Sequence, residues 1–160
     1  DEHPCDIVAT FLGAHAVPPE YKGRTADYVA MVITEMIPAV AADKLARFCD
    51  GFCEEGVFTV EQSRRVLTAA REHGMEPKLH ADELNPTGGA ELAADVGAIS
   101  ADHLIRVSDE GIAAMAAASV VEPVLTSLGG GGFLTARSPS GHTQVFDFFV
   151  QTPKYKRPEA

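Results

Sequence analysis

Residues 77–105 read PKLHADELNPTGGAELAADVGAISADHLI, and this stretch decides the fold. The short apolar run Pro77 to His80 leads into a turn rich in Gly and Pro, then into an Ala-rich helical segment that ends near Val96. A second β-prone run extends from Ile99 to Ile105. Strand, helix and strand joined by short connections are typical of a βαβ unit, whose two strands are parallel. The stretch therefore predicts a parallel sheet covered by helices.

The same alternation continues toward the N-terminus. Ile7 to Leu12 and Phe48 to Cys53 are short, β-prone runs. Between them, Thr25 is expected to cap a helix, and Pro38 is expected to kink or shorten its last turn. The apolar residues of this helix recur at the spacing of one buried stripe: Val29, Val32, Ile33, Met36, Ile37 and Val40.

Further helices are marked by their capping residues. Thr59 to Gln62 has the form of a capping box and predicts a helix to about His73, ended by Gly74. Ser108 is expected to cap another Ala-rich helix, and Val120 to Leu125 reads as a fifth strand. Predicted strands and helices therefore alternate along this part of the chain.

Five strands without a glycine-rich dinucleotide fingerprint favour a barrel over an open nucleotide-binding sheet. A (β/α)8 TIM barrel usually needs about 250 residues, whereas this chain has 160. The fold class expected from the sequence is therefore α/β, a partial (β/α)8 TIM barrel.

The composition and the residue pattern of the sequence change after Leu125. A run of glycines from Gly129 to Gly132 precedes two strands, Phe133 to Ala136 and Thr143 to Val150, around a turn at Ser138 to Gly141. This pattern predicts a β-hairpin. We therefore expect two parts, a partial barrel over 1–118 and a β segment with a tail over 119–160.

Composition excludes several classes of partner. The formal net charge is −10, from 23 acidic and 13 basic residues, which argues against binding to a nucleic-acid backbone. The longest apolar regions are interrupted by Glu35 with Pro38 and by Glu122 with Pro123, so no membrane partner is expected. Three cysteines, Cys5, Cys49 and Cys53, are interpreted as free thiols in a reducing cytoplasm.

Titratable residues stand where the expected strands end. His15 follows the first strand, His80 with Asp82 and Glu83 ends the third, and His103 lies in the fourth. In a barrel the carboxyl ends of the strands point to one mouth, so these residues should converge.

Each histidine taken alone is better interpreted as a core or surface residue. Their repetition at three strand ends favours a site instead. Asp50 and Glu54 could face the same mouth, but solvated loop acids are the default interpretation.

The spacing from His80 to Glu83 suits metal-assisted hydrolysis. Such a reaction needs an imidazole to hold an ion, a carboxylate to accept a proton from water and a group to protonate the leaving nitrogen. His103 lies one helix and one strand beyond Glu83 and could supply the last function.

Three stretches of the chain resemble the imidazolonepropionase family of the amidohydrolase superfamily. They are TFLGAHAVPPEY (10–21), FCEEGVFTVEQS (52–63) and LHADELNPTGGAELAADVGAISADHLIRVSD (79–109), within a resemblance that covers about residues 6–115. It implies an amidohydrolase-type barrel that opens 4-imidazolone-5-propanoate to N-formimino-glutamate, in cytoplasmic histidine degradation.

The resemblance also implies residue roles. His80 would be the metal ligand for one zinc or iron ion, Glu83 and His103 would be catalytic, and His15 with Glu83 would bind the small-molecule substrate. The resemblance leaves open whether the chain forms a homo-oligomer. The paired His-x-His and the late aspartate of the family are not among these residues, so we expect an incomplete metal site and an inactive isolated chain.

Residues 119–134 and 147–153 instead resemble the early part of a γ-glutamyltransferase. Phe149 stands where that family has a substrate-binding arginine. The alternatives to the hydrolase are therefore a γ-glutamyltransferase segment and a partly folded composite without catalytic activity.

Overall fold

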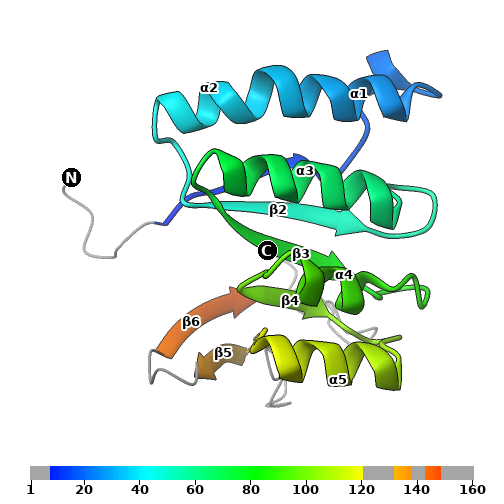
Figure 1. Cartoon of the computed structure of the whole chain (residues 1–160), viewed down its shortest axis with the longest axis vertical. Coiled ribbons are helices and arrows are strands. Elements are labelled where there is room, and N and C mark those ends of the chain that lie inside the picture. Colours follow the sequence, from blue (N-terminus) through cyan, green and yellow to red (C-terminus); the bar gives the residue numbers. More distant parts are fainter. Residues whose placement is uncertain (1–7, 121–131, 138–142, 149–160) are drawn as a thin grey trace, which may run out of the picture.

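The computed structural model describes residues 8–120, 132–137 and 143–148. Strands and helices alternate along the first of these ranges (Figure 1). The strands of this range are β1 (Thr10–Ala14), β2 (Phe48–Cys53), β3 (Glu76–Ala81) and β4 (Ser100–His103). They form one sheet in the order β1-β2-β3-β4, and every neighbouring pair is parallel. The predicted α/β fold with a parallel sheet is confirmed, and sequential parallel strands are compatible with a partial barrel.

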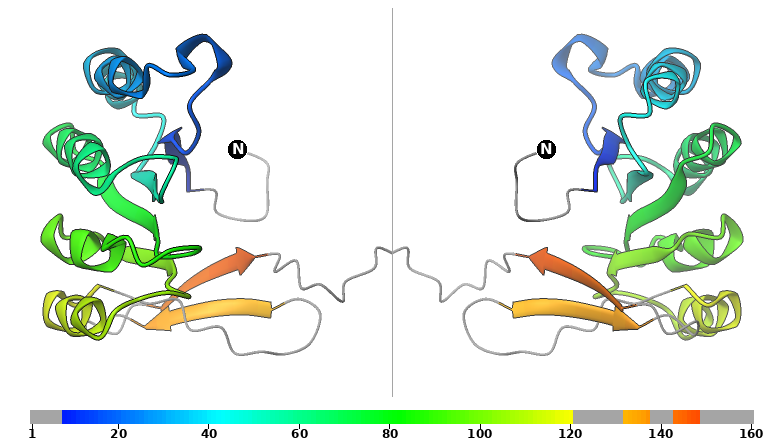
Figure 2. Two further views of the ribbon diagram at one scale, coloured as in Figure 1. Left: turned by 90° about the vertical axis from the view of Figure 1, so that its right-hand side faces the viewer. Right: turned by 90° about the vertical axis from the view of Figure 1, so that its left-hand side faces the viewer.

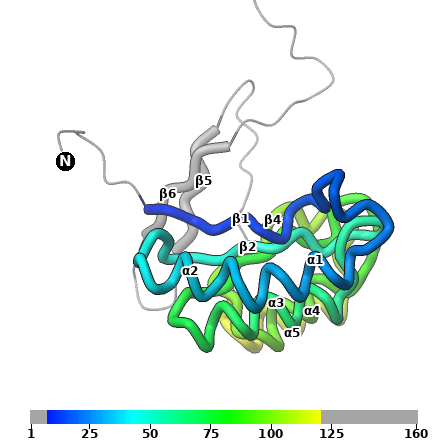
Figure 3. Tube along the Cα trace, turned by 90° about the horizontal axis from the view of Figure 1, so that it is seen from above, coloured from blue at the N-terminus to red at the C-terminus, as the bar shows by residue number. Residues whose placement is uncertain are grey.

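The helices all lie on the same face of this sheet (Figure 2), and the view from above shows them along one side of the strands (Figure 3). They are a short 3-10 turn (Pro19–Tyr21), α1 (Thr25–Met31), a π-helical segment (Val32–Met36), α2 (Ile37–Ala42), α3 (Val60–Glu72), α4 (Gly89–Asp95) and α5 (Asp109–Ala118).

Alternation along the strands separates two faces. Cys49 and Cys53 of β2, with Leu79 and Ala81 of β3, are completely buried in the core beneath the helices. The intervening side chains therefore point to the opposite face, which no helix of the described residues covers. That uncovered face positions the candidate site.

Close packing of α4 on β3 explains one glycine. A Cβ atom at Gly89 would lie 2.7 Å from the Cβ of Ala81, closer than two carbons can approach. The chain can therefore turn from the end of β3 directly into a helix that rests on the same strand.

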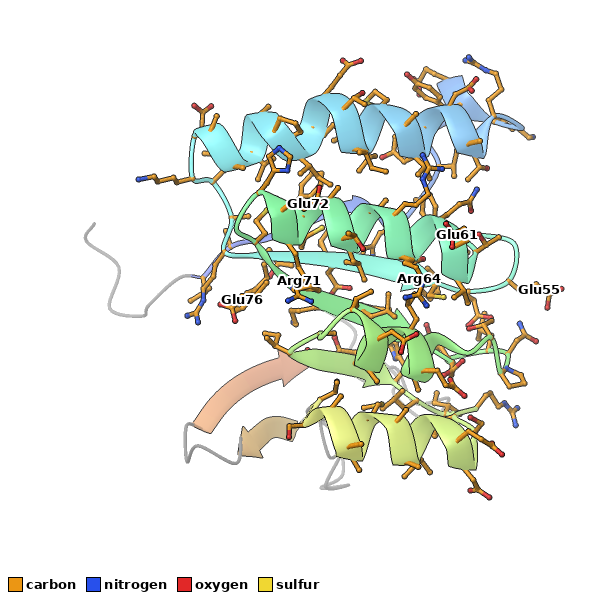
Figure 4. All side chains as sticks on the ribbon, in the orientation of Figure 1. Glu55, Glu61, Arg64, Arg71, Glu72 and Glu76 are labelled. Carbon is orange, nitrogen blue, oxygen red and sulfur yellow. The ribbon has the colours of Figure 1, made fainter. Side chains whose placement is uncertain are left out.

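Two ionic and polar contacts hold α3 beside α4. Arg64 and Arg71 extend from α3 toward α4 (Figure 4). Arg64 pairs with Asp95 at 3.0 Å, and Arg71 donates to the carbonyl oxygen of Val96 at 2.6 Å.

Several expectations about element ends are confirmed. Thr59 accepts from the backbone N–H of Gln62 and Gln62 accepts from that of Thr59, which completes the capping box of α3. Ser108 accepts from the N–H of Gly111 at the start of α5.

One expectation about the N-terminal elements is wrong. Thr25 is the first residue of α1 rather than its cap, since Arg24 precedes the helix without a side-chain cap. The predicted first strand is present as β1, but it extends to Ala14 instead of Leu12, and Ile7 lies outside the described residues. Pro38 lies in the first turn of α2, directly after the π-helical segment, and its effect on the last turn stays a prediction.

The continuous helical stretch Thr25–Ala42 is long and apolar enough, by length and composition, to cross a membrane. Its residues Val29, Val32 and Ile37 are completely buried against the core, as the predicted stripe requires. The absence of a membrane partner stays a prediction.

The predicted hairpin strands are present as β5 (Gly132–Arg137) and β6 (Thr143–Phe148), which pair antiparallel. The expected turn at 138–141, the glycine run up to Gly131 and the fifth strand beyond Val120 lie outside the described residues.

Candidate functional site

The histidines singled out at the strand ends lie next to one another at the carboxyl ends of the strands. His15 follows β1, His80 lies in β3 and His103 ends β4. The ring centroid of His80 is 4.6 Å from that of His15 and 5.0 Å from that of His103. The structure therefore brings together residues that are 65 and 23 positions apart in the sequence.

Asp50 of β2 lies between two of these histidines. The His80 Nδ1 atom is 3.0 Å from Asp50 Oδ1 and within hydrogen-bonding geometry of it. The His15 Nε2 atom lies 3.3 Å from the same oxygen but has no hydrogen-bond partner, although it is buried. One carboxylate oxygen thus faces both imidazoles.

The interpretation of Asp50 as a solvated loop acid is wrong. Its exposed fraction is 2%, and it lies within a strand. The signal was available in the sequence, since an aspartate at an alternate position of the apolar run FCDGFC must point away from the buried Cys49 and Cys53.

The electrostatics of the pair follow from burial and hydrogen bonding. Burial by itself would raise the pKa of Asp50, but the imidazoles of His15 and His80 outweigh it and lower this pKa from 3.8 to about 2. Burial would lower the pKa of His80, but the hydrogen bond and negative charge of Asp50 outweigh it and raise this pKa above 6.5.

These shifts predict a pH window for the stability that the pair contributes. The lowered pKa of Asp50 gives stability that is present above pH 3.8 and lost as the pH falls through about 2. The raised pKa of His80 gives stability that is present below pH 6.5 and lost as the pH rises through its folded-state pKa.

The free energy of unfolding can be measured with urea, in the presence of a chelator, for the unchanged chain and for Asp50→Asn. The two proteins should therefore differ most between about pH 4 and about pH 6.5. A difference of the same size at about pH 3 and at about pH 8 would contradict this assignment.

Glu83 and His103 form a second group at the same edge. Glu83 Oε2 lies 3.5 Å from His103 Nε2, and the two side chains are 30% and 35% exposed. His103 has a positive φ of 76°, an uncommon conformation for a residue with a side chain. These two predicted catalytic residues are thus adjacent and accessible to a small molecule.

Asp82, which the sequence grouped with the site, has a structural role. Its Oδ1 atom accepts from the N–H groups of Thr87, Gly88 and Gly89 and from the Thr87 hydroxyl, and its Oδ2 accepts from the N–H of Ala90. It is 1% exposed. Asp82 therefore fixes the loop after β3 and the N-terminus of α4.

Glu54 is also a buried structural acid rather than a solvated one. It is 2% exposed and accepts hydrogen bonds from the N–H of Leu84 and from the Asn85 amide. This carboxylate joins the loop after β2 to the loop after β3, the loop that carries Glu83. The interpretation of Glu54 as a solvated acid is wrong.

The donor atoms around His80 suit a metal ion. One atom each from His15, Asp50 and His80 can be chosen so that all three lie within 4.8 Å of one another. Imidazole nitrogen and carboxylate oxygen are the ligands that zinc and iron use in proteins. Among the described residues this is a group that could hold a cation.

Comparison with curated proteins shows which enzymes the chain is similar to. The chain is 62% identical over 120 residues to an imidazolonepropionase of Bacteroides fragilis, a match of 75% of this chain and 29% of that protein. It is 62% identical over 125 residues to that of Geobacillus kaustophilus, or 78% of this chain and 30% of the relative. The chain is related to the imidazolonepropionases. No protein-family model matches it.

The extent of the similarity has two consequences. The chain spans about a third of the length of the imidazolonepropionases that it matches. The match to the imidazolonepropionase of Brevibacillus brevis, 58% identical, covers 145 residues, 91% of this chain and 34% of that protein, so it continues past residue 119. The boundary between 118 and 119, and the γ-glutamyltransferase resemblance beyond it, stay predictions.

Proposed function

We propose that the chain carries part of the active site of an imidazolonepropionase-type hydrolase. The reaction is the hydrolytic opening of 4-imidazolone-5-propanoate to N-formimino-glutamate, a step of histidine degradation, in the cytoplasm. The observation that carries the proposal is the meeting of His15, His80, Glu83 and His103 at one edge of the sheet, in a chain related to imidazolonepropionases. An amidohydrolase-type barrel is the architecture that this function implies.

The residues divide the chemistry between them. His80 would hold one zinc or iron ion, which when bound supplies Lewis acidity toward the ring carbonyl and toward water. Glu83 would accept the proton of the attacking water, and His103 would donate a proton to the leaving ring nitrogen. Their separation of 3.5 Å allows that proton to move from Glu83 to His103 between the two steps. His15 and Glu83 would contact the substrate.

The site lies on a surface suited to a small substrate. Phe52 stacks beside His15 at a ring-centroid distance of 6.2 Å and contacts His80 edge-on at 6.3 Å. An apolar wall beside convergent polar groups is typical of sites for small molecules.

A chimaera tests the proposal directly. Residues 8–118 of this chain would replace the corresponding segment of the Bacteroides fragilis imidazolonepropionase, and hydrolysis of the imidazolone ring would be measured. We expect kcat/KM within about tenfold of the parent enzyme, equivalent to about 1.4 kcal/mol of transition-state stabilisation. The isolated chain is expected to show no turnover. A folded chimaera that binds metal but lacks hydrolysis would refute the proposal.

A further inference from the structure

We propose that Glu54 is a positioning residue, whose buried carboxylate holds the backbone at Glu83 so that the Glu83 side chain keeps its place beside His103. The inference deepens the proposed function, on which it rests for the role of Glu83 as the proton acceptor. Glu54 acts through Glu83, not through contact with the substrate.

The hydrogen bond from Leu84 carries the proposal. The Leu84 N–H donates to Glu54 Oε2 at 3.0 Å, and this nitrogen belongs to the peptide unit that follows the Cα atom of Glu83. A peptide unit is planar, so holding its N–H also holds the carbonyl carbon of Glu83. The Leu84 side chain is 63% exposed, so its burial does not anchor the segment. The carboxylate of Glu54 therefore fixes the backbone on the carboxyl side of Glu83.

The peptide unit on the other side of Glu83 is held as well. The carbonyl oxygen of Asp82 accepts from the N–H of Arg106 at 2.7 Å. Arg106 lies in the loop after β4, the strand that ends at His103. Glu83 is thus held between a backbone contact to that loop and a side-chain contact from the loop after β2. Of these two contacts, the one from Glu54 can be removed by replacing a side chain.

Glu54 is itself firmly placed. It is 2% exposed, and its Oε1 atom accepts from the Asn85 amide at 2.9 Å and from the N–H of Glu55 at 3.1 Å. Its own N–H donates to the carbonyl oxygen of Phe58 at 3.2 Å, and Phe58 is 1% exposed. Glu54 therefore connects the loop after β3 to a residue of the core.

The hydrogen bonds also keep this carboxylate ionised. Burial by itself would raise the pKa of Glu54, but the donors of Leu84, Asn85 and Glu55 outweigh it and lower this pKa below its ordinary value. Hydrogen bonds to an ionised acceptor are about twice as strong as those between neutral groups. A glutamine at this position would offer one acceptor oxygen in place of two, so it would hold the loop less firmly.

The position of Glu83 matters for the proposed reaction. Its Oε2 atom lies 3.5 Å from His103 Nε2, and proton transfer requires the groups to approach hydrogen-bonding distance. A displacement of a reacting group by about 1 Å can lower the rate by about 100-fold. Loss of the Glu54 carboxylate should therefore slow the reaction although Glu83 and His103 are both still present.

Steady-state kinetics of the chimaera test this expectation. Glu54→Ala should lower kcat by about 10- to 100-fold. The metal content should stay the same, because His80 is unchanged. Glu54→Gln should recover part of the lost kcat, since its carbonyl oxygen can still accept from the Leu84 N–H.

A double-mutant cycle separates positioning from a general loss of structure. If Glu54 acts through Glu83, Glu54→Ala should change kcat by less than about threefold in a chimaera that already carries Glu83→Gln. An equal loss in the presence and in the absence of the Glu83 carboxylate would overturn the proposal.

Two control variants accompany the cycle. Glu61→Ala removes an exposed glutamate near the start of α3 (Figure 4) and should leave kcat unchanged. Val66→Ala changes a completely buried core residue of α3, so it should lower the melting temperature and leave kcat unchanged. A fall of kcat in Val66→Ala as large as that in Glu54→Ala would also overturn the proposal, because stability and not position would then determine the rate.

Amide hydrogen exchange of the full chain tests the contact without any activity. The Leu84 N–H should exchange at least about tenfold faster in Glu54→Ala than in the unchanged chain, whereas the N–H of Arg106 should keep its rate. If Glu54→Ala does not fold, Glu54→Gln takes its place in both experiments, with the same direction of change. Hydrolysis by the chimaera with unchanged exchange at Leu84 would count against this inference alone. Faster exchange at Leu84 without any hydrolysis by the chimaera would count against the proposed function alone.

Discussion

Replacing Asp82 by alanine is expected to lower the free energy of unfolding by about 4 kcal/mol, because buried donors left without an acceptor cost about 1 to 3 kcal/mol each. Asp82 accepts five hydrogen bonds from the loop after β3 and from the start of α4. Some of these donors would gain water, which keeps the expected cost below the full sum. Urea unfolding followed by circular dichroism measures the change.

Asp95→Ala is the matched control for this prediction. Asp95 lies in the same helix, but its side chain is 63% exposed and pairs with Arg64 at the surface. Exposed pairs contribute about 0 to 1 kcal/mol, so this variant should be close to the unchanged chain. A loss smaller than about 1 kcal/mol in Asp82→Ala would show that the loop and helix do not depend on this carboxylate.

The second large effect concerns catalysis. Glu83→Gln in the chimaera is expected to lower kcat by about 10² to 10⁴-fold, the usual contribution of a general acid or base. The amide keeps the size of the side chain beside His103 but cannot accept a proton from water. Metal content should not change, because the metal ligand proposed in this chain is His80 and not Glu83. Steady-state kinetics together with metal analysis separate these two quantities.

Glu55→Gln serves as the control for Glu83→Gln. Glu55 is an exposed glutamate on the loop after β2 (Figure 4), and its replacement should leave kcat unchanged. Equal activity of the chimaera with and without the Glu83→Gln substitution would remove Glu83 from the reaction. A loss of metal in parallel with activity would instead give it a role in holding the ion.

Much of the fold could be predicted because local signals agreed with one another. The capping residues and glycines indicated where helices begin and end, and the alternation of β-prone and helical runs indicated parallel strands. The errors lie where tertiary contacts override local signals. β1 ends two residues later than its apolar run because its pairing with β2 extends to Ala14.

The acidic residues show most clearly which roles the sequence could not distinguish. Asp50, Glu54, Asp82 and Glu83 all stand near strand ends, yet of these four only Glu83 and Asp50 face the histidines. Glu54 and Asp82 accept hydrogen bonds from the backbone N–H groups of neighbouring loops instead. The path of each loop decides whether an acid accepts hydrogen bonds from backbone N–H groups or contacts an imidazole. A local residue pattern does not encode that path by itself.

The sequence by itself determined that His15, His80 and His103 would meet, since parallel strands bring their carboxyl ends to one edge of a sheet. Only the tertiary structure decided that Asp50 joins them. The register of β2 against β3 sets Phe52 beside His80 and Asp50 beside Lys78, so the carboxylate of Asp50 reaches the Nδ1 atom of the histidine along the strand. The alternation of side chains along a strand decides on which face of the sheet a residue lies. The register of the strands and the length of the side chain decide which residue it contacts.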